Sequence, residues 1–489
     1  MIDDWRLATG DGAPSTGSAR WSSRSSMRAD KLKLELQRKR AEPVLGAPIL
    51  CRFRMAICLL TVAGANSIAP AQTTGTNALP IDLPTALRLA GARNLDVQIA
   101  RENLHEAQAN RQSAVEHFFP WVAPGIGYHR RDGVAQASPS GQISDANYQS
   151  WTPGATAVAQ LNLGNSIYTT LAARQLVKAS DQALETQRQD ATLAAAQGYF
   201  DLVKARALVG VVNEAIQISL DYQQQLHAAV VAGIAFKGDE LRVQTQTERH
   251  LIALQQALER QRSASVNLAQ VLHLDATVEL APLDTGLTSL TLFPTNASMS
   301  ALVAQALNGR PELKQSEALM AATRAEKNGA VYGPLIPSVG AQVFGGGLGG
   351  GPEGSSGTFD GMADYTVGLS WQIGPGGLFD SGRIRASKAR LAATQLAQSK
   401  LKDTITSQVV DALVAVNSTA AQIQLAEQSL NTASETLRLT RQRKQYGVGI
   451  VLEDIEAQQA LTQAHADYVT ALAEYNKAQY ALSRAIGGL

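Results

Sequence analysis

The stretch that decides the fold is RIRASKARLAATQLAQSKLKDTITSQVVDALVAVNSTAAQIQLAEQSLNTASETLRLTRQRKQY, residues 383–446, a run of 64 residues without Gly or Pro. Tyr446-Gly447-Val448-Gly449 follows, and a second uninterrupted run continues to Ile486. Because Gly and Pro are the usual helix breakers, this pattern predicts two very long helices joined by a tight turn. The first would be on the order of 95 Å long at about 1.5 Å per residue. So long a helix must pack along other helices, in a bundle or coiled coil.

The returning run carries the seven-residue repeat of a coiled coil. Its large seam residues are Leu461, Tyr468, Tyr475 and Leu482, and the alanines three positions later are Ala464, Ala471, Ala478 and Ala485. Small residues at one seam position let helices approach closely, while the larger residues fill the space between them.

Directly before the long run, the period changes from helical to alternating. Apolar Tyr365, Val367, Leu369, Trp371 and Ile373 alternate with Asp364, Thr366, Gly368, Ser370 and Gln372. About ten residues suffice for a tilted strand to cross a bilayer, and apolar-out, polar-in alternation is typical of a water-filled membrane barrel. A half-buried strand of a soluble sheet fits the same pattern, so this strand alone leaves both interpretations open.

The start of the chain resembles a secretory leader. Arg52-Phe53-Arg54 precedes the apolar run Ala56 to Ala65, and Ala69-Pro70-Ala71 follows. This order predicts a signal peptide cleaved after Ala71. Cys51 and Cys58 both precede that site, so we expect a mature chain with no cysteine, no disulfide and no lipid anchor.

Composition places few limits on function. The 489 residues are 45% hydrophobic and carry a formal net charge of +1, which favours neither a nucleic-acid binder nor a disordered acidic chain. Without residues 1–71, 32 Lys and Arg stand against 36 Asp and Glu, a net charge of −4. The polar residues before the signal predict a downstream start such as Met27, with an extended tail as the alternative. Beyond the signal, we expect no apolar stretch long enough for a transmembrane helix.

Two passages of the sequence repeat each other. Asn94-Leu95-Asp96-Val97 and Arg310-Pro311-Glu312-Leu313 each lead into an Ala-rich run that ends at Phe119-Pro120 or Ile336-Pro337. Setting Asn94 against Arg310 gives an offset of 216 residues, and the two terminal prolines agree with it to within one residue. This spacing indicates an internal duplication.

After each proline, the pattern predicts two strands and then a helical hairpin roughly 100 Å long. The expected strands are Val122–Arg131, Ala155–Leu163, Ser338–Phe344 and Ala363–Ile373. Gly345–Gly357 is expected to be a flexible exposed loop, since it links two strands and resembles no phosphate-binding loop. The hairpin turns are expected at Ala232-Gly233-Ile234 and Val448-Gly449-Ile450.

This arrangement predicts an α+β membrane protein that oligomerises. Four strands cannot close a barrel around a lumen, and an open sheet in lipid would leave backbone groups unpaired at its edges. Three copies would supply twelve strands, an even antiparallel number wide enough for a pore, with their helices forming a hollow cylinder.

At this point the chain resembles the TolC-like outer-membrane efflux proteins over residues 81–489. The resemblance rests on the duplicated order of elements, on the two turn sequences, and on Gly376-Gly377-Leu378-Phe379-Asp380-Ser381-Gly382-Arg383 after the last strand. It implies a homotrimer in the outer membrane of a Gram-negative bacterium, in contact with outer-membrane lipid, whose helices extend into the periplasm. It also implies that the helical tips dock a periplasmic adaptor protein and an inner-membrane transporter, which supplies the energy for passive transport.

With that resemblance the chain divides into eight parts. These are a leader (1–71), a first-repeat N-terminal helix (72–118), a first transmembrane β-hairpin (119–163), a first periplasmic helical hairpin (164–281), a linker (282–299), a second-repeat N-terminal helix (300–336), a second transmembrane β-hairpin (337–374) and a second periplasmic helical hairpin (375–489).

The resemblance also implies a constriction at the periplasmic end. Glu453 and Glu456, one helical turn apart, match positions where carboxylates narrow the entrance in the family, and threefold symmetry would make them a cation-attracting ring. The second turn is one or two residues shorter than the family pattern, and the alternative register places Asp454 at the constriction. A solvated helix face would show the same carboxylates without the resemblance.

Two further sets of residues follow from the resemblance. Tyr446 and Asp239 match a tyrosine and an aspartate that link adjacent hairpins in some members. The tips expected to dock the adaptor contain Gly233, Ile234, Val448, Gly449 and Ile450.

The residues favour no enzyme. The seven histidines are scattered without metal-ligand spacing, and we find no nucleophile elbow, phosphate loop or cysteine motif. We therefore expect no cofactor, no metal site and no nucleic-acid partner. The alternatives are an outer-membrane duct for type I protein secretion and, from another class, a periplasmic coiled-coil scaffold or adaptor. The scaffold would not need four amphipathic strands.

Overall fold

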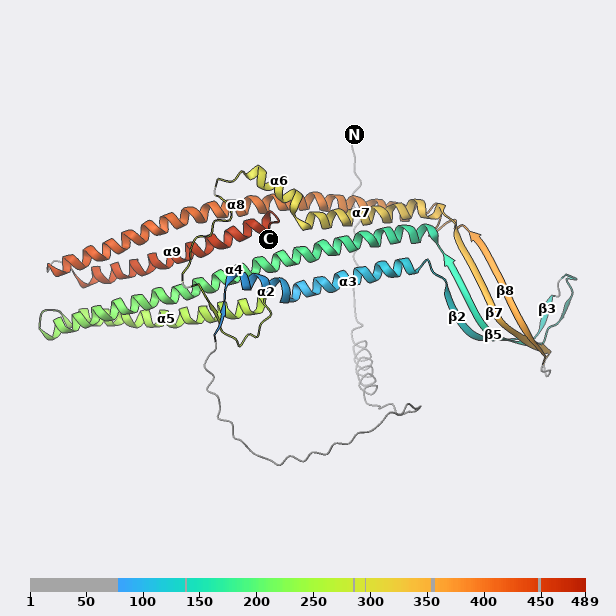
Figure 1. Ribbon diagram of the computed structural model, residues 1–489, viewed down its shortest axis with the longest axis horizontal. Helices are drawn as coiled ribbons and strands as arrows, with labels where there is room; N and C mark the ends of the chain where they lie inside the picture. The colour runs from blue at the N-terminus through green and yellow to red at the C-terminus, as the bar shows by residue number, and fades with distance from the viewer. Residues whose placement is uncertain (1–77, 137–138, 285, 295, 353–356, 447–449) are drawn as a thin grey trace, which may run out of the picture. The chain divides into compact units, whose positions relative to one another are not determined.

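The computed structural model describes residues 78–489 apart from 137–138, 285, 295, 353–356 and 447–449 (Figure 1). The predicted signal peptide, both cysteines and Met27 lie outside these residues. So do Gly447, Val448 and Gly449 of the second turn.

The chain forms two copies of one series of elements. The first copy contains β1 (Leu79–Ile81), α2 (Leu83–Arg93), α3 (Leu95–Glu116), β2 (Trp121–Arg131), β3 (Val134–Gln136), β4 (Ile143–Asp145), β5 (Tyr148–Leu161), α4 (Leu163–Val231) and α5 (Lys237–Val271). After the linker strand β6 (Leu280–Pro282), the second copy contains α6 (Met299–Gly309), α7 (Pro311–Tyr332), the 3₁₀ turn η1 (Gly333–Leu335), β7 (Ser338–Pro352), β8 (Thr358–Ser370), α8 (Ser381–Gln445) and α9 (Val451–Ala485). Equivalent helices agree in length: 11 residues for α2 and α6, 22 for α3 and α7, and 35 for α5 and α9.

Each N-terminal helix, expected to be continuous, is broken at the residue that anchors the repeat. The Asn94 side chain accepts hydrogen bonds from the N–H groups of Asp96 and Val97, so it ends α2 and caps α3. In the second copy, Pro311 occupies the first turn of α7, where its missing N–H costs nothing. The residues before α2 also differ from the expected helix, because Leu79–Ile81 form β1 and pair in parallel with β6.

The two arms of each helical hairpin are unequal, which corrects the expectation of hairpins about 100 Å long throughout. The long arms α4 and α8 have 69 and 65 residues, or about 100 Å, whereas the return arms α5 and α9 have 35, or about 50 Å. Beyond the return arms, α3 and α7 pack along α4, and α6 and α7 pack along α8 (Figure 1). The shorter helices therefore complete the bundle that the return arms leave open.

The four long strands form one antiparallel sheet in the order β2-β5-β7-β8 (Figure 1). The expected loop at Gly345 is wrong as far as Pro352, because these residues continue β7. A Cβ atom at Gly347 or Gly349 would come within 2.3 or 2.5 Å of the Phe359 ring, so the glycines make room for a neighbouring aromatic side chain within the sheet.

Other strand boundaries also move. β5 begins at Tyr148, seven residues before the expected start, and Leu163 is the first residue of α4. β8 begins at Thr358, earlier than expected, and ends at Ser370. The extra pair β3 and β4 extends the first β-hairpin and was not expected.

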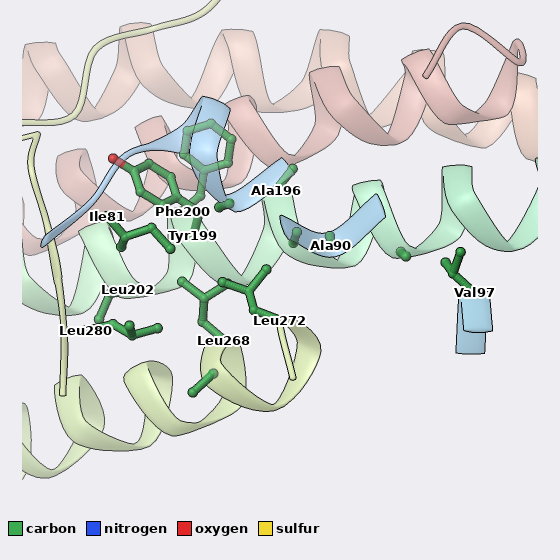
Figure 2. Close-up of a cluster of buried hydrophobic side chains, with 14 of the residues drawn as sticks. Ile81, Ala90, Val97, Ala196, Tyr199, Phe200, Leu202, Leu268, Leu272 and Leu280 are labelled. Carbon is green, nitrogen blue, oxygen red and sulfur yellow. The ribbon is translucent and has the colours of Figure 1, made fainter. Parts of the chain in front are cut away.

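The first copy encloses its own core where α4 meets α2, α5, β1 and β6. Tyr199, Leu202, Leu268 and Leu280 are almost fully buried there, as Figure 2 shows. A second buried cluster joins α6, α8 and the end of α9 around Ile405, Val409 and Leu482.

Within the described residues one helix, Ser381–Lys444, contains an 18-residue window with a mean hydropathy of 1.2, long and apolar enough to cross a membrane. The helix meets this criterion by length and composition only. The apolar residues Ile405, Val409, Leu413 and Val416 of this helix are buried against the second core cluster, so packing accounts for part of its apolar character.

Candidate functional site

One face of the four-stranded sheet is apolar across every strand. The pairing register aligns Tyr128 of β2 with Trp151 of β5, Gly349 of β7 and Phe359 of β8. Counting by twos from this row toward the helices, the side chains on the same face are Val122, Pro124, Ile126, Pro153, Ala155, Ala157, Ala159, Leu161, Val339, Ala341, Val343, Ala363, Tyr365, Val367 and Leu369. In the other direction this face ends with the polar pair Arg130 and Gln149. The Tyr128 and Trp151 rings pack with their centroids 4.4 Å apart. Most of the larger side chains on this face are exposed in the single chain.

The opposite face carries most of the charged and polar side chains of the sheet, together with several larger apolar ones. The row that aligns Ala123 with Thr156, Phe344 and Asp364 belongs to it. The other charged or polar side chains of this face are His129, Arg131, Tyr148, Ser150, Thr152, Gln160, Ser338, Gln342, Thr358, Asp360, Thr366 and Ser370, and the other larger apolar ones are Trp121, Val158, Leu348 and Met362. A sheet with one exposed apolar face and one polar face fits the wall between lipid and a water-filled lumen.

The turn between α4 and α5 exposes large apolar side chains. Gly233 has φ +73°, a left-handed conformation that glycine adopts easily, and it ends α4. Val231, Ile234 and Phe236 around it are 75%, 82% and 74% exposed. Ile234 was expected at this tip, whereas Val231 and Phe236 were not singled out. Three exposed apolar side chains at one turn are typical of a protein contact site.

A buried carboxylate holds this first turn together. Glu240 of α5 lies 2.9 Å from His227 Nδ1 of α4 and accepts a hydrogen bond of 2.6 Å from Lys237 Nζ. Its side chain is 9% exposed. The hydrogen bonds from Lys237 and then His227 hold the pKa of the Glu240 carboxyl below its ordinary value. Neither Glu240 nor His227 was predicted from the sequence as a site residue.

Asp454 holds the corresponding place at the second turn. Its side chain is 2% exposed, and Oδ2 accepts a hydrogen bond of 2.7 Å from Gln458 Nε2. Oδ1 accepts no hydrogen bond from any residue that the structure describes, and Arg441 Nε lies 3.9 Å away from it. Burial raises the pKa of the Asp454 carboxyl, against the opposing effects of Arg441, Gln458 and Lys444.

Asp454 lines a pocket of about 400 Å³ between the two hairpins, together with Tyr222 of α4 and Arg441 and Lys444 of α8. The Lys444 ammonium lies 3.7 Å from the centroid of the Tyr222 ring. Burial lowers the pKa of this lysine. The side chain of Asp454 therefore contacts helices of its own chain.

The other two acidic residues of the expected constriction are more accessible. Glu453 forms an ion pair of 3.3 Å with Arg443, and Glu456 is exposed. Among the described residues we find no direct contact between Tyr446 and Asp239 of one chain: Tyr446 is 83% exposed, and Asp239 pairs with Arg242 at 3.1 Å. Ile450 is exposed at the second tip, next to residues outside the described part of the chain.

Over the described residues, no group of three or more His, Cys, Asp or Glu side chains is arranged to hold a metal ion. What the geometry provides is a two-faced sheet, a bundle of long helices and two helical turns with clustered charges. Together these features define the class of outer-membrane channels built from strands and long helical hairpins.

Comparison with known proteins agrees with this class. The family model described as outer membrane efflux protein matches residues 86–272 and 302–488, two segments whose starts and ends both lie 216 residues apart. The chain belongs to the outer membrane efflux protein family and is a protein of the outer membrane. The matched segments also confirm the internal duplication at its predicted offset. A search of curated proteins finds no match.

Solved structures share the fold. The outer-membrane channel OprN is 18% identical with a TM-score of 0.70, over 83% of this chain and 90% of that one. The Campylobacter jejuni CmeC outer membrane channel is 18% identical with a TM-score of 0.68, over 88% and 94% of the two chains. The Vibrio cholerae outer membrane protein VceC is 17% identical with a TM-score of 0.69, over 83% and 96%.

Proposed function

We propose that the protein is the exit duct of a tripartite efflux system: a homotrimer that passively conducts substrates from an inner-membrane pump and a periplasmic adaptor across the outer membrane. The observation that carries this proposal is the apolar face that runs unbroken across β2, β5, β7 and β8. An exposed face of this size needs lipid to cover it.

The free edges of the sheet support the trimer. β2 and β8 lie at opposite edges and run antiparallel to each other through the strand order, so β8 of one copy can pair with β2 of the next (Figure 1). Three copies give twelve strands and leave no unpaired edge in lipid. The long helices, continuous with the sheet at α4 and α8, would then form the periplasmic part of the duct.

The first turn supports docking of an adaptor. Gly233 and Ile234 lie at its centre, and the exposed side chains of Val231 and Phe236 extend the apolar tip. We assign Val448, Gly449 and Ile450 to the same role at the second turn by the equivalence of the two copies. The adaptor would link these tips to the inner-membrane transporter.

Of the three acidic residues near the second turn, Glu453 and Glu456 are accessible and Asp454 is buried. We therefore assign the constriction to Glu453 and Glu456, and not to Asp454, which the alternative register would use. A residue in the lumen must reach the ion path, and Asp454 is buried against Tyr222 and Gln458 within its own chain. Three copies of Glu456 would form a negative ring that attracts cations. A link between Tyr446 of one hairpin and Asp239 of an adjacent copy is proposed to hold the entrance narrow.

Single-channel recording in a planar bilayer tests this function. We expect cation-selective openings from the purified protein, and wider or less selective openings from the double variant Glu453→Ala with Glu456→Ala. Glu435→Ala is a matched control, because this exposed acid pairs with Arg438 on α8. If Asp454→Asn changes selectivity and the double variant does not, the constriction uses the other register. Folded protein that never inserts would favour the periplasmic scaffold instead.

A further inference from the structure

We propose that β8 of one copy pairs with β2 of the next in the register that sets Asp360 opposite Arg131 of the next copy, forming an ion pair on the lumen face at each of the three seams. This inference rests on the proposed trimer and deepens it, because it specifies which residues join the copies.

The register within one chain fixes the relative height of its two edge strands. Across the sheet, Ala123 of β2 lies level with Asp364 of β8, and Gly125 lies level with Met362. Continuing in steps of two places Gly127 level with Asp360. A sheet closed without any stagger would therefore put Gly127 of the next copy opposite Asp360.

Barrel closure adds a stagger. Strands of membrane barrels tilt by about 35–45°, so twelve strands need a shear of about 12 to 17. With three identical copies, each seam contributes about 4 to 6 residues, and a shift of 6 would place Trp121 beyond the end of β8, so the strand ends select 4. A shift of this size moves Arg131 of the next copy into the place opposite Asp360.

The strand ends determine the direction of the shift. In the proposed direction, residues 121–131 of β2 face residues 370–360 of β8, so every residue of β2 has a partner inside β8. In the other direction only residues 121–125 would face residues 362–358, and the remainder of β2 would lie beyond the start of β8. Unpaired backbone groups in lipid make the second arrangement unfavourable.

Arg131 and Asp360 also belong to the same face. Both lie on the polar side of the sheet, in step with Ala123 and Asp364. A slip of two residues either way would still leave Arg131 diagonal to Asp360, within reach of a long side chain. In the proposed register, His129 would lie opposite Met362.

Within the described part of one copy, no other charged residue competes with the proposed pair of Arg131 and Asp360. Among the described residues, neither Arg131 nor Asp360 has an ion pair, and Asp360 accepts a hydrogen bond from the N–H of the next residue, Gly361. The neighbouring Arg130, on the opposite face, pairs with Asp132 at 2.9 Å in its own chain. One of two adjacent arginines is thus paired within the copy, and the other faces the seam.

Cysteine cross-linking in outer membranes tests the register. We expect Arg131→Cys with Asp360→Cys to give a covalent trimer on denaturing gels under oxidising conditions, with at least five-fold more product than Arg131→Cys with Thr358→Cys or with Met362→Cys. Arg130→Cys with Asp360→Cys is the matched control on the wrong face. Each single-cysteine variant controls for cross-linking through the native Cys51 and Cys58.

The outcomes separate this inference from the proposed function. A trimer by light scattering whose cross-linking is strongest at another position would overturn the Arg131–Asp360 register and leave the channel intact. Folded protein that stays monomeric would overturn the channel itself. If the cysteine pair does not fold, Arg131→Glu should lower the trimer fraction and Arg131→Glu with Asp360→Arg should restore it; absence of restoration contradicts the pair.

Discussion

The first helical hairpin turns between α4 and α5, and the second turns between α8 and α9 after a long arm of similar length. The fourth residue of each return helix is a buried acid, Glu240 in α5 and Asp454 in α9. Its partner in both hairpins is the residue four before the end of the long arm. His227 lies 2.9 Å from Glu240, whereas Arg441 lies 3.9 Å from Asp454.

This difference changes the chemistry of an equivalent position. Glu240 reaches its partners and has a lowered pKa, while the shorter Asp454 is buried beyond close contact with Arg441 and has a raised pKa. Duplication preserved the carboxyl group but not its surroundings: Lys237, whose hydrogen bond is the main cause of the lowered pKa of Glu240, is replaced by Val451 in α9, and burial is the main cause of the raised pKa of Asp454.

The exposed residues of the two turns differ as well. The third and sixth residues of α5 are Asp239 and Arg242, which form an ion pair of 3.1 Å. The same positions of α9 are Glu453 and Glu456, two like charges one turn apart. Glu453 lies in the first turn of α9, where the helix dipole favours an acid, and it pairs with Arg443. Glu456 has no ion pair among the described residues, and a second negative charge one turn after Glu453 destabilises the helix slightly, so helix stability does not explain Glu456. This asymmetry favours a functional role for the second turn.

The largest effect on stability is expected at the C-terminal ends of the return helices α5 and α9, where the two copies differ. Arg484 of α9 is buried and binds Asp190 of the first copy and Glu312 of the second, whereas the equivalent residue of α5 is the exposed Gln270. Arg484→Ala should lower the free energy of unfolding by about 2 kcal/mol, because it removes the charge-assisted hydrogen bonds to Asp190 and Glu312, while Glu312 keeps its ion pair with Arg310.

Gln270→Ala is the matched control and should change the free energy of unfolding by less than about 0.5 kcal/mol. Denaturant unfolding in detergent measures both variants. Equal losses for the two would show that the ion pairs of Arg484 contribute no more than an exposed side chain.

A smaller effect is expected at the anchors of the repeat. Asn94→Ala should cost about 1 kcal/mol, since it removes the N-cap of α3 and the hydrogen bond of 2.9 Å to the carbonyl of Val271. Asn94→Asp keeps the cap but has no N–H to donate to the carbonyl of Val271, so it should recover only part of the loss. In the second copy, Glu312 and Gln408 bind the Arg310 side chain, which caps nothing. Arg310→Asn should therefore not be stabilising, and a gain in denaturation midpoint would contradict this comparison.

Much of this comparison could be predicted from the sequence. The 216-residue spacing of Asn94 and Arg310 indicated the duplication, and the alternation around Val367 indicated a two-faced strand. Both signals are repeating patterns along the chain. Such patterns can be recognised without knowing which residues pack against each other in the fold.

The predictions from sequence that were wrong or absent depend on contacts between segments that are distant in sequence. Glycines usually mark loops, so Gly347 and Gly349 suggested one; the Phe359 ring that fills their space belongs to the next strand. Three acidic residues lie close together at 453, 454 and 456, and the sequence could not show that Asp454 points toward Tyr222 and Arg441. Glu240 and His227 could have been found by aligning the two turns with each other.

Giving one hairpin turn the residue found at the equivalent position of the other tests whether the second turn has a special role in selectivity. Glu456→Arg gives α9 the arrangement of α5 and should form an ion pair with Glu453, which stabilises the helix by about 0.3 kcal/mol. The same change should reduce cation selectivity in planar bilayers. Arg242→Glu, the reverse exchange, should leave selectivity unchanged. Selectivity that responds equally to both exchanges would contradict a special role of the second turn.

The smallest effect concerns the pH dependence of the two turns. Because the folded pKa of Glu240 is lowered, its stabilisation is present above the ordinary value of 4.5 and is lost as pH falls through the folded pKa. Because the folded pKa of Asp454 is raised, the second turn is favoured below the ordinary value of 3.8 and loses stability as pH rises through the folded pKa. Acidification from about pH 5 to about pH 3.5 should therefore loosen the first turn of α5 and tighten that of α9. Hydrogen exchange, corrected for intrinsic rates, should show opposite changes, with Glu240→Gln abolishing one and Asp454→Asn the other. Changes of the same sign at both turns, unaffected by either variant, would mean that other carboxylates control the pH response and that the two buried acids do not differ in the way their surroundings indicate.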